Sequence, residues 1–252
     1  MAENFRQSEI LDIARRKGRV SVEKLARRFQ TSAQTIRKDL SDLSESGQLK
    51  RVHGGAILPE TASVIGYEDR RQLNHNAKTR IAKACAHDIP DGACVFLNIG
   101  TTTEAVAREL LQHDALTVVT NNLNVANILS AAPQIDVMVA GGTLRRSDGG
   151  LIGAMTTKFI AQFKFDHAVI GCSALDEDGD ILDFDIQEVE VSQTIIARSR
   201  ATFLVSDCSK FDRSAPVKIA TLESIHRVYT DADLPPELAQ SCVAWDTDLR
   251  VC

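Results

Sequence analysis

Apolar residues recur at helical spacing in three successive segments near the N-terminus of the chain. They mark the buried faces of three predicted helices, at Ile10, Ile13 and Ala14, then at Val22, Leu25, Ala26 and Phe29, and then at Ile36, Leu40 and Leu43. Gly18 ends the first helix, and Ser21 is the expected N-cap of the second. We expect a capping box at the third helix, with Thr31 as the cap and Gln34 reaching back to it.

Two short strands are predicted after the third helix. They cover residues 48–52 and 56–58 and flank the turn His53-Gly54-Gly55. Two helices, a tight turn, a third helix and a β-hairpin together make a winged helix-turn-helix. We therefore expect a domain of this kind over residues 1–58.

The rest of the chain alternates between short apolar runs and amphipathic segments. A linker is expected at 59–75, turning helical near Tyr67. The predicted strands are 95–99, 116–120, 135–140, 167–172, 201–205 and 227–230, and the predicted helices are 77–87, 103–111, 125–130, 157–163 and 189–198. Short apolar strands between amphipathic helices are typical of a parallel sheet covered on both faces. The expected fold class is therefore α/β, with a winged helix-turn-helix followed by a parallel-sheet domain over 76–252.

The composition is that of an ordinary globular protein, with 44% hydrophobic and 25% charged residues among 252. The longest uncharged run, 115–135, contains four asparagines and Pro133, so we expect no membrane span and no membrane partner. Without a signal peptide, the expected location is the cytoplasm. The six cysteines show no C-x-x-C spacing and the six histidines no ligand spacing, so neither a metal nor a cofactor is expected.

Charge divides unevenly along the chain. Residues 1–58 contain 12 Lys and Arg against 7 Asp and Glu, a net charge of +5. Residues 59–252 contain 17 against 27, a net charge of −10. Only the basic N-terminal domain is therefore expected to meet a polyanion such as DNA.

The third predicted helix has the side chains that read DNA. Glutamine can contact adenine and arginine can contact guanine, while lysine neutralises phosphate. The candidate DNA-binding residues are Ser32, Gln34, Thr35, Arg37, Lys38, Arg51 and His53. A small basic helical bundle that binds something else is the alternative. Which of these side chains contact bases and which contact phosphates stays open.

Polar residues follow several predicted strands, where ligands bind in parallel α/β sheets. The segment Gly100-Thr101-Thr102-Thr103 joins a strand to a helix and predicts an anion cradle of free N–H groups and hydroxyls, although a simple capped turn has the same pattern. Lys210, which follows a strand with Asp207 and Ser209, could supply a charge for a phosphate or be a solvated surface lysine. Asp185 and Glu188, near Asp183, could cap a helix or hold ligand hydroxyls. The other candidates at strand ends are Asn121, Asn122, Gly141, Gly142 and Arg145.

Several motifs carry a resemblance to a known family. The stretch TSAQTIRKDLSDLSESGQLKRVHGGAIL resembles the DeoR family of bacterial repressors, and the likeness continues in NIGTTTEAVA, VVTNNLNVANIL, VAGGTLRRSDGGLIG, LDFDIQEVEVSQTII and VSDCSKF. It implies a repressor of carbon-utilisation genes with a body like ribose-5-phosphate isomerase and the CoA transferases. A dimer or tetramer would bind a near-palindromic operator and release it on binding a phosphorylated polyol, with glycerol 3-phosphate favoured.

The alternative function is a sugar-phosphate isomerase with an added DNA-binding domain. VSDCSKF is similar to the Asp-x-Ser-Lys segment on the phosphate side of that isomerase. When SQTII is set against the isomerase helix, however, Gln193 falls where the glutamate base stands, and a Lys-Gly-Gly-Gly segment is absent. Because a neutral amide cannot take a proton from the substrate, we expect binding without turnover and no enzyme.

Overall fold

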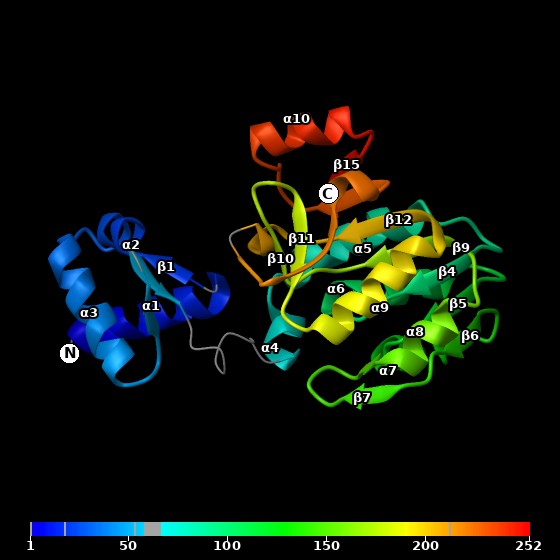
Figure 1. Ribbon diagram of the computed structural model, residues 1–252, viewed down its shortest axis with the longest axis horizontal. Helices are drawn as coiled ribbons and strands as arrows, with labels where there is room; N and C mark the ends of the chain where they lie inside the picture. The colour runs from blue at the N-terminus through cyan, green and yellow to red at the C-terminus, as the bar shows by residue number, and fades with distance from the viewer. Residues whose placement is uncertain (1, 18, 53, 58–66, 212) are drawn as a thin grey trace. The chain divides into compact units, whose positions relative to one another are not determined.

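The chain divides into two units, Met1–Gly66 and Tyr67–Cys252. The computed structural model in Figure 1 describes residues 2–17, 19–52, 54–57, 67–211 and 213–252. Of the linker expected at 59–75, residues 59–66 lie outside the described part of the chain, and residues 67–75 belong to the second unit.

The first unit is a winged helix-turn-helix, as predicted. Its elements are α1 (Ala2–Lys17), β1 (Arg19–Ser21), α2 (Val22–Arg28), α3 (Ala33–Glu45), β2 (Lys50–Val52) and β3 (Gly55–Ile57). The strands form an antiparallel sheet in the order β1-β3-β2. Ile10, Leu25, Ile36 and Leu40, which belong to the predicted apolar stripes, are fully or almost fully buried in its core.

Two local features of this unit differ from the expectation. The N-cap of α3 is Ser32, whose Oγ accepts a hydrogen bond from the Thr35 N–H at 3.1 Å, so the capping box expected between Thr31 and Gln34 is wrong. The helix begins one residue later than that box requires, which leaves Gln34 too early in the first turn to reach back. Strand β1 was not predicted, and it explains Gly55, because a Cβ there would lie 1.9 Å from the Val20 carbonyl oxygen.

The second unit is built on seven parallel strands. They are β4 (Cys94–Leu97), β5 (Thr117–Thr120), β6 (Asp136–Val139), β9 (Phe165–Ile170), β12 (Ser199–Val205), β14 (Arg227–Thr230) and β15 (Asp248–Val251). Their order in the sheet is β15-β14-β12-β9-β4-β5-β6, and every neighbouring pair is parallel. The predicted α/β fold is therefore confirmed, and β15 is an edge strand that the pattern did not predict.

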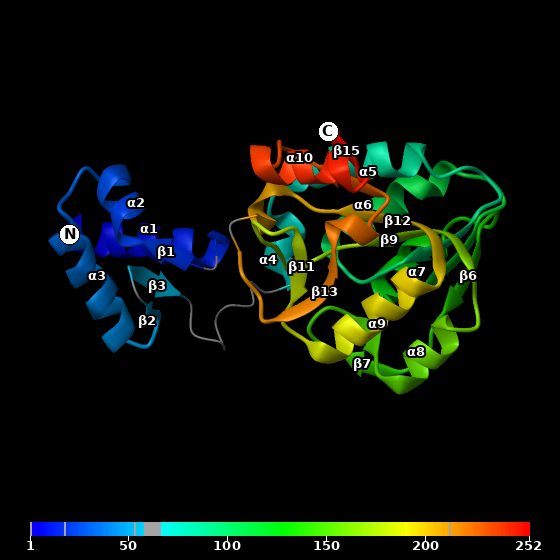
Figure 2. The same cartoon turned by 45° about the horizontal axis from the view of Figure 1, so that its top comes forward.

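Helices cover both faces of this sheet (Figures 1 and 2). Successive residues of a strand face opposite sides, so Val95 packs in one core and Phe96 in the other. The core around Val95 includes side chains of α5 (His75–His87), α6 (Thr101–Glu109) and α7 (Leu123–Leu129). The core around Phe96 includes side chains of α8 (Ala154–Ile160), α9 (Ile186–Ala197) and α10 (Pro236–Ala244).

Smaller elements surround the central sheet. They are α4 (Tyr67–Gln72), the hairpin β7 (Thr143–Arg145) and β8 (Gly150–Ile152), an antiparallel sheet of β10 (Ala174–Leu175), β11 (Asp180–Asp183) and β13 (Val217–Thr221), and the 3-10 turns η1 (Leu110–Gln112), η2 (Cys208–Lys210) and η3 (Leu222–Ser224). Among the described helices, none has the length and apolar character needed to cross a membrane.

All five helices predicted in the second unit begin two or three residues earlier than their apolar stripes predict, and α6 and α9 show why. Helix α9 begins at Ile186 because Asp185 caps it, with its Oδ1 accepting from the Gln187 N–H at 2.9 Å. Helix α6 begins at Thr101 rather than Thr103, directly after Gly100, whose φ of +139° suits glycine. In both cases residues that lie outside the predicted helix form its first turn.

The order of the strands places a crevice at the middle of the sheet. Strand β4 lies between β9 and β5. The chain runs from β4 to β5 on one side of it, and the later strand β9 pairs with β4 on the other side. In open parallel sheets the loops after two such strands diverge, which leaves a binding site at their carboxyl ends.

Candidate functional site

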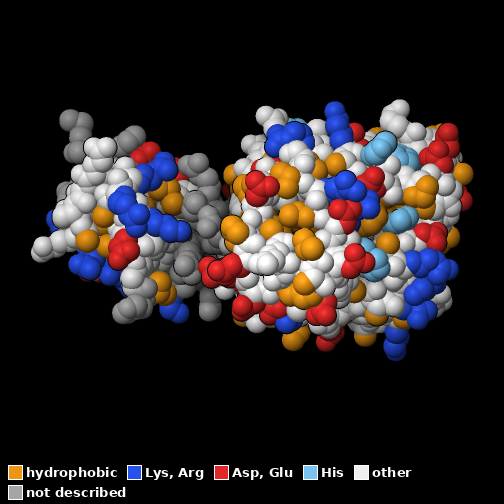
Figure 3. Space-filling model, turned by 90° about the horizontal axis from the view of Figure 1, so that it is seen from above, with side chains coloured by type: hydrophobic (Ala, Val, Ile, Leu, Met, Phe, Trp, Pro, Cys, Tyr) orange, Lys and Arg blue, Asp and Glu red, His pale blue; other side chains and the backbone are white. Residues whose placement is uncertain are grey.

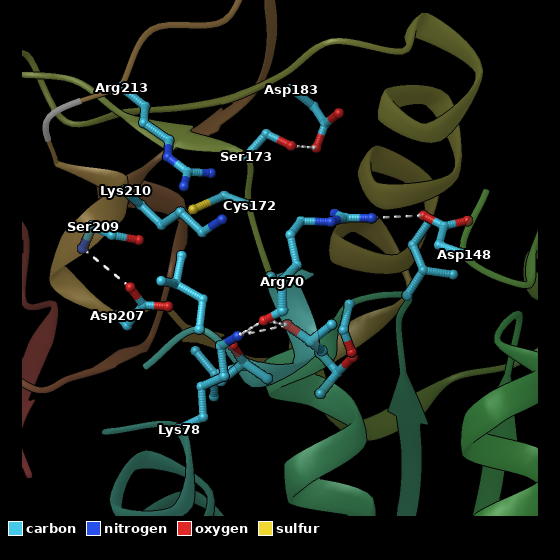
Figure 4. Close-up of a pocket in the computed structure, with 18 of the residues that line it drawn as sticks. Arg70, Lys78, Asp148, Cys172, Ser173, Asp183, Asp207, Ser209, Lys210 and Arg213 are labelled. Carbon is cyan, nitrogen blue, oxygen red and sulfur yellow. Dashed lines mark hydrogen bonds and ion pairs between the residues drawn. The ribbon is translucent and has the colours of Figure 1, made fainter. Parts of the chain in front are cut away.

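A pocket of about 610 Å³, part of it open to solvent, lies at these strand ends. The loops after β4, β9 and β12 and the start of α6 supply most of its walls, and α4, α5, α9, the end of β11 and the β7–β8 turn supply the rest (Figure 4). Besides the apolar Leu73, Ile99 and Val205, its lining residues are Arg70, Lys78, Gly100, Thr101, Thr102, Thr103, Asp148, Gly171, Cys172, Ser173, Asp183, Glu188, Asp207, Ser209, Lys210 and Arg213. The whole pocket belongs to the second unit.

Lys78, Lys210 and Arg213 occupy one side of this pocket (Figure 4). Lys78 is 5% exposed, and burial lowers the pKa of its ammonium to about 8. Burial, together with the positive charge of Arg213, lowers the pKa of Lys210 to about 8 as well. Burial also lowers the pKa of Arg213. An anion bound beside these groups would stabilise their charged forms, because it replaces lost hydration with an opposite charge.

The N-terminus of α6 borders the same side. The first N–H groups of a helix have no acceptor within the helix, and they favour an anion. Thr103 Oγ1 turns back to the Gly100 carbonyl oxygen at 2.7 Å, which fixes the turn before the helix. Lys78 Nζ donates to Thr101 Oγ1 at 2.9 Å, so the ammonium lies at the start of α6. A helix N-terminus and lysine charges therefore meet in one place.

Carboxylates occupy the opposite side. Asp183, at the end of β11, accepts hydrogen bonds from Ser173 Oγ at 2.9 Å and from the Phe184 N–H at 2.6 Å. Glu188 on α9 is 2.5 Å from Arg145 Nη1. Burial and the charge of Asp183 nevertheless raise the pKa of Glu188 to about 8, outweighing Arg145. This side can accept hydrogen bonds from ligand hydroxyls.

Asp207 and Ser209 also belong to the cationic side, and they differ in their hydrogen bonding. Asp207 accepts from the Ser209 N–H at 3.1 Å and from Asn74 Nδ2 at 2.8 Å. Burial raises the pKa of Asp207, but these hydrogen bonds and the charge of Lys210 outweigh it and lower the pKa overall. Ser209 Oγ is buried and has no hydrogen-bond partner in the described part of the protein. A buried hydroxyl without a partner costs about 1–3 kcal/mol, which a ligand in the pocket could recover.

In the first unit, α3 presents polar side chains away from its buried stripe. Ser32, Gln34, Arg37 and Lys38 are exposed and Thr35 is half-buried, while His53 lies outside the described residues. Figure 3 shows Lys and Arg side chains on the visible face of this unit.

Two arginine contacts hold the first unit's surface in place. Arg51 Nη1 on β2 donates to the Arg37 carbonyl oxygen at 3.1 Å, which ties the wing to α3. Arg6 on α1 forms a two-pronged ion pair with the buried Asp39, at 2.5 and 2.9 Å. This pair fixes α3 against α1, and the hydrophobic pattern gave no sign of it.

Comparison with known proteins identifies both units. A family model for the DeoR-like helix-turn-helix domain matches residues 6–62, and one for the DeoR C terminal sensor domain matches residues 73–232. The glycerol-3-phosphate regulon repressor of Escherichia coli strain K12 is 42% identical over 252 residues, which is 100% of each chain. That of Haemophilus influenzae is 42% identical over 100% of this chain and 98% of its own.

The chain belongs to the DeoR family. It is a transcriptional repressor and not an enzyme, like the proteins that it matches along its whole length. Among solved structures, ribose 5-phosphate isomerase A from Methanocaldococcus jannaschii is 14% identical and covers 55% of each chain with a TM-score of 0.41. The family assignment rests on the two sequence matches.

The DeoR sensor domain brings some of the expected strand-end residues together and not others. Gly100, Thr101, Thr102, Thr103, Glu188 and Lys210 line the pocket. Asn121, Asn122, Gly141 and Gly142 do not: Asn121 and Asn122 are fully buried beside the β7–β8 hairpin, and Gly141 and Gly142 are exposed in the connection from β6 to β7. Leu151 in that hairpin exchanges hydrogen bonds with Asn121, and Asn122 caps α7.

Arg145 and Asp185 do not line the pocket, but Arg145 contacts residues that do. The Arg145 guanidinium contacts Asp148 at 2.6 Å, Glu188 at 2.5 Å and Asp185 at 3.2 Å. Its charge partly neutralises two carboxylates that do line the pocket. Asp185 is an N-cap, so its place in the structure fits the capping interpretation rather than contact with a ligand.

Several pocket residues of this DeoR chain escaped sequence reasoning. Arg70, Lys78, Asp148 and Arg213 were not among the candidates, and Asp207 and Ser209 were noted only beside Lys210. Lys78 did leave a signal, since it lies on the buried stripe of its helix with Ile81, Ala82 and Cys85. Because lysine is almost never fully buried without a partner, a lysine on a buried stripe indicates a functional charge.

The structure does not support the argument from Gln193 against catalysis. Gln193 is exposed on α9, outside the pocket, and its amide donates to the Lys218 and Ile219 carbonyl oxygens. Four carboxylates line the pocket instead. That the DeoR chain is a regulator follows from its relatives and not from a missing base.

Metal and thiol chemistry find little support in the pocket. In the part of the chain that the structure describes, no three His, Cys, Asp or Glu side chains are grouped to hold a metal ion. Burial raises the pKa of the pocket's Cys172 to about 11, so its thiol is protonated at neutral pH and is a poor nucleophile.

Proposed function

We propose that this repressor binds glycerol 3-phosphate in the pocket of its sensor domain and then releases its operator. The observation that carries the proposal is the division of the pocket into a cationic side and a carboxylate side. A phosphorylated polyol has the matching division, with a dianionic phosphate at one end and hydroxyl groups at the other.

The phosphate would lie between Lys210, Arg213 and the N-terminus of α6. Lysine, arginine and a helix N-terminus each favour a phosphate. The buried Ser209 hydroxyl would gain the partner that it lacks among the described residues.

The polyol hydroxyls would face Asp183 and Glu188. Carboxylate oxygens accept hydrogen bonds from hydroxyl groups, and Ser173 already supplies one such bond to Asp183. The name of the relatives that match the whole chain favours the same ligand over larger sugar phosphates.

The operator interface would be the exposed face of α3 together with the wing. Gln34, Thr35, Arg37 and Lys38 would enter the major groove, with Ser32, Arg51 and His53 at the backbone or the adjacent bases. Two such units from a dimer or tetramer would bind two half-sites of a near-palindromic operator.

A thermal-shift series tests the ligand directly. The purified full-length protein is heated with glycerol 3-phosphate, fructose 1-phosphate, fructose 6-phosphate, glycerol or inorganic phosphate. We expect the largest rise in melting temperature with glycerol 3-phosphate and no rise with glycerol, because at equal concentration the ligand with the lowest Kd stabilises the native state most. A larger rise with a fructose phosphate would reject glycerol 3-phosphate as the effector.

A further inference from the structure

Helix α4 is the first described element after the winged helix-turn-helix unit, and it also forms part of the pocket wall. It begins at Tyr67, where the second unit starts, and Arg70 on α4 lines the pocket. Any ligand that moves Arg70 therefore acts on the segment of chain that leads to the DNA-binding unit.

The Arg70 side chain is held weakly. Its Nη2 lies 3.6 Å from Asp148 Oδ2, and its buried Nε has no hydrogen-bond partner in the described part of the protein. Arg145 approaches the same Asp148 oxygen at 2.6 Å and is the closer partner of that carboxylate. Figure 4 shows the Arg70 guanidinium inside the pocket, directed toward Asp148. A bound anion would therefore compete for Arg70 against a long ion pair.

The backbone of α4 is held by a second pocket cation. Lys78 Nζ donates to the Arg70 carbonyl oxygen as well as to Thr101 Oγ1. A phosphate at the start of α6 would draw hydrogen bonds from this ammonium and weaken its hold on α4. The side chain and the carbonyl of Arg70 thus both depend on groups that face the ligand.

Other contacts define the ligand-free position of α4. Tyr67 donates its hydroxyl proton to Glu104 Oε2 at 2.8 Å, and Glu104 is 1% exposed. Asn74, which follows α4 in the left-handed region at φ +55°, donates to Asp207 Oδ1 at 2.8 Å. Because neither contact uses the Arg70 side chain, this position does not require it.

We propose that Arg70 couples the pocket to the DNA-binding unit: a ligand anion draws its guanidinium away from Asp148, and α4 moves with it. This inference rests on the proposed function, since it needs an anionic ligand in the pocket. The ligand-free position of α4 is the one that allows operator binding, and the ligand stabilises the displaced one. A ligand shifts such an equilibrium only by its difference in affinity between the two states, and Arg70 supplies that difference.

Two binding measurements on full-length Arg70→Ala test the coupling. Calorimetry gives its affinity for glycerol 3-phosphate, and fluorescence anisotropy gives its operator Kd without ligand and at saturating ligand. In the wild type we expect saturating ligand to raise the operator Kd by about 5- to 150-fold. In Arg70→Ala we expect ligand binding within about tenfold of the wild type, normal operator binding without ligand, and a ligand effect close to onefold.

The matched control is Arg71→Ala, which removes an exposed arginine of the same helix outside the pocket. It should keep the full ligand effect. Hydrogen exchange supplies a second readout. In the wild type, ligand should change exchange in peptides from 67–74 and protect those from 100–104, whereas in Arg70→Ala only the second change should remain.

The outcomes separate the two proposals. If saturated Arg70→Ala releases the operator as the wild type does, the coupling role is refuted while the ligand assignment stands. Loss of operator binding by ligand-free Arg70→Ala would also refute it, because Arg70 would then hold the DNA-binding state. If wild type binds none of the phosphorylated polyols, the proposed function fails, and the coupling role fails with it.

Discussion

Replacement of Lys210 by alanine should weaken the response to ligand and leave the rest of the protein intact. The Lys210 ammonium forms neither a hydrogen bond nor an ion pair with the residues that the structure describes, although Asp207 and Arg213 are near enough to shift its pKa. Its removal therefore leaves no buried partner without a bond. It relieves repulsion with Arg213 and loses the attraction to Asp207, and because these two effects oppose each other the ligand-free protein should melt near the wild-type temperature.

The expected loss follows from the contact that the ammonium would make. A hydrogen bond to a charged group contributes about 1.5–3 kcal/mol net. Each 1.4 kcal/mol is a factor of ten in affinity, so the substitution should weaken glycerol 3-phosphate binding roughly 10- to 150-fold. The pocket is buried enough to lower the pKa of this lysine to about 8, which argues for the upper part of that range.

Anisotropy of a fluorescent operator duplex, obtained by selection from a random pool, measures the effect. Wild type, Lys210→Ala and the control Lys158→Ala, which removes an exposed lysine of α8, are titrated with glycerol 3-phosphate. The control should release the operator at the wild-type ligand concentration, and Lys210→Ala only at much higher concentration. Release at the wild-type concentration would remove Lys210 from the site. Loss of operator binding without ligand would mean that Lys210 supports the fold instead.

Four further predictions concern the same two surfaces. Raising the pH from 7 to 9 should weaken glycerol 3-phosphate binding about tenfold for each of the two pocket lysines, because Lys78 and Lys210 lose protons near pH 8 while Glu188 gains a negative charge. A Kd that calorimetry finds constant over this range would contradict the prediction. Thr101→Val should cost less ligand affinity than Lys210→Ala in the same assay, because it removes a neutral donor; an equal loss would argue otherwise. Arg37→Ala should weaken operator binding. If Arg37 contacts a phosphate, the loss should be similar on all DNA sequences and the salt slope should fall by about 0.9; if it contacts a base, the loss should be about 1–3 kcal/mol and limited to the operator sequence. Unchanged affinity would reject α3 as the recognition helix. Ribose 5-phosphate incubated with the protein should show no isomerisation by NMR, whereas turnover in proportion to protein concentration would support the isomerase alternative.

The hydrophobic pattern of the sequence predicted most of the helices and strands of this protein. Period-3.6 stripes predicted α3, and short apolar runs predicted six of the seven strands of the central sheet, all except the edge strand β15. Helix starts were less accurate, because capping depends on one side chain. Ser32 rather than Thr31 caps α3, and Asp185 extends α9 by three residues beyond its apolar stripe.

The candidate site was predicted only where local sequence was enough. The segment Gly100–Thr103 follows β4 and Lys210 follows β12, so placing ligands at strand ends found them. Asn121 and Gly141 obey the same rule but follow β5 and β6 and lie outside the pocket: Asn121 is hydrogen-bonded to Leu151 of the β7–β8 hairpin, and Gly141 is exposed and accepts from Thr156 of α8. Alternation of strands and helices specifies which faces are buried, and it does not specify the order of strands.

Arg70 and Arg213 had no local signal. One comes from a segment expected to be a linker, and the other from a charged stretch after η2. Their place in the pocket depends on contacts between segments far apart in the chain, such as Asn74 with Asp207. Only the folded structure shows that these cations share one cavity.

A crystal structure of the full-length protein with glycerol 3-phosphate tests the central claim most directly. The account predicts the phosphate within hydrogen-bond distance of Lys210 and the first N–H groups of α6, with the hydroxyls directed to Asp183 and Glu188. A phosphate bound elsewhere, for instance beside Asn121 and Gly142 at the ends of β5 and β6, would contradict it.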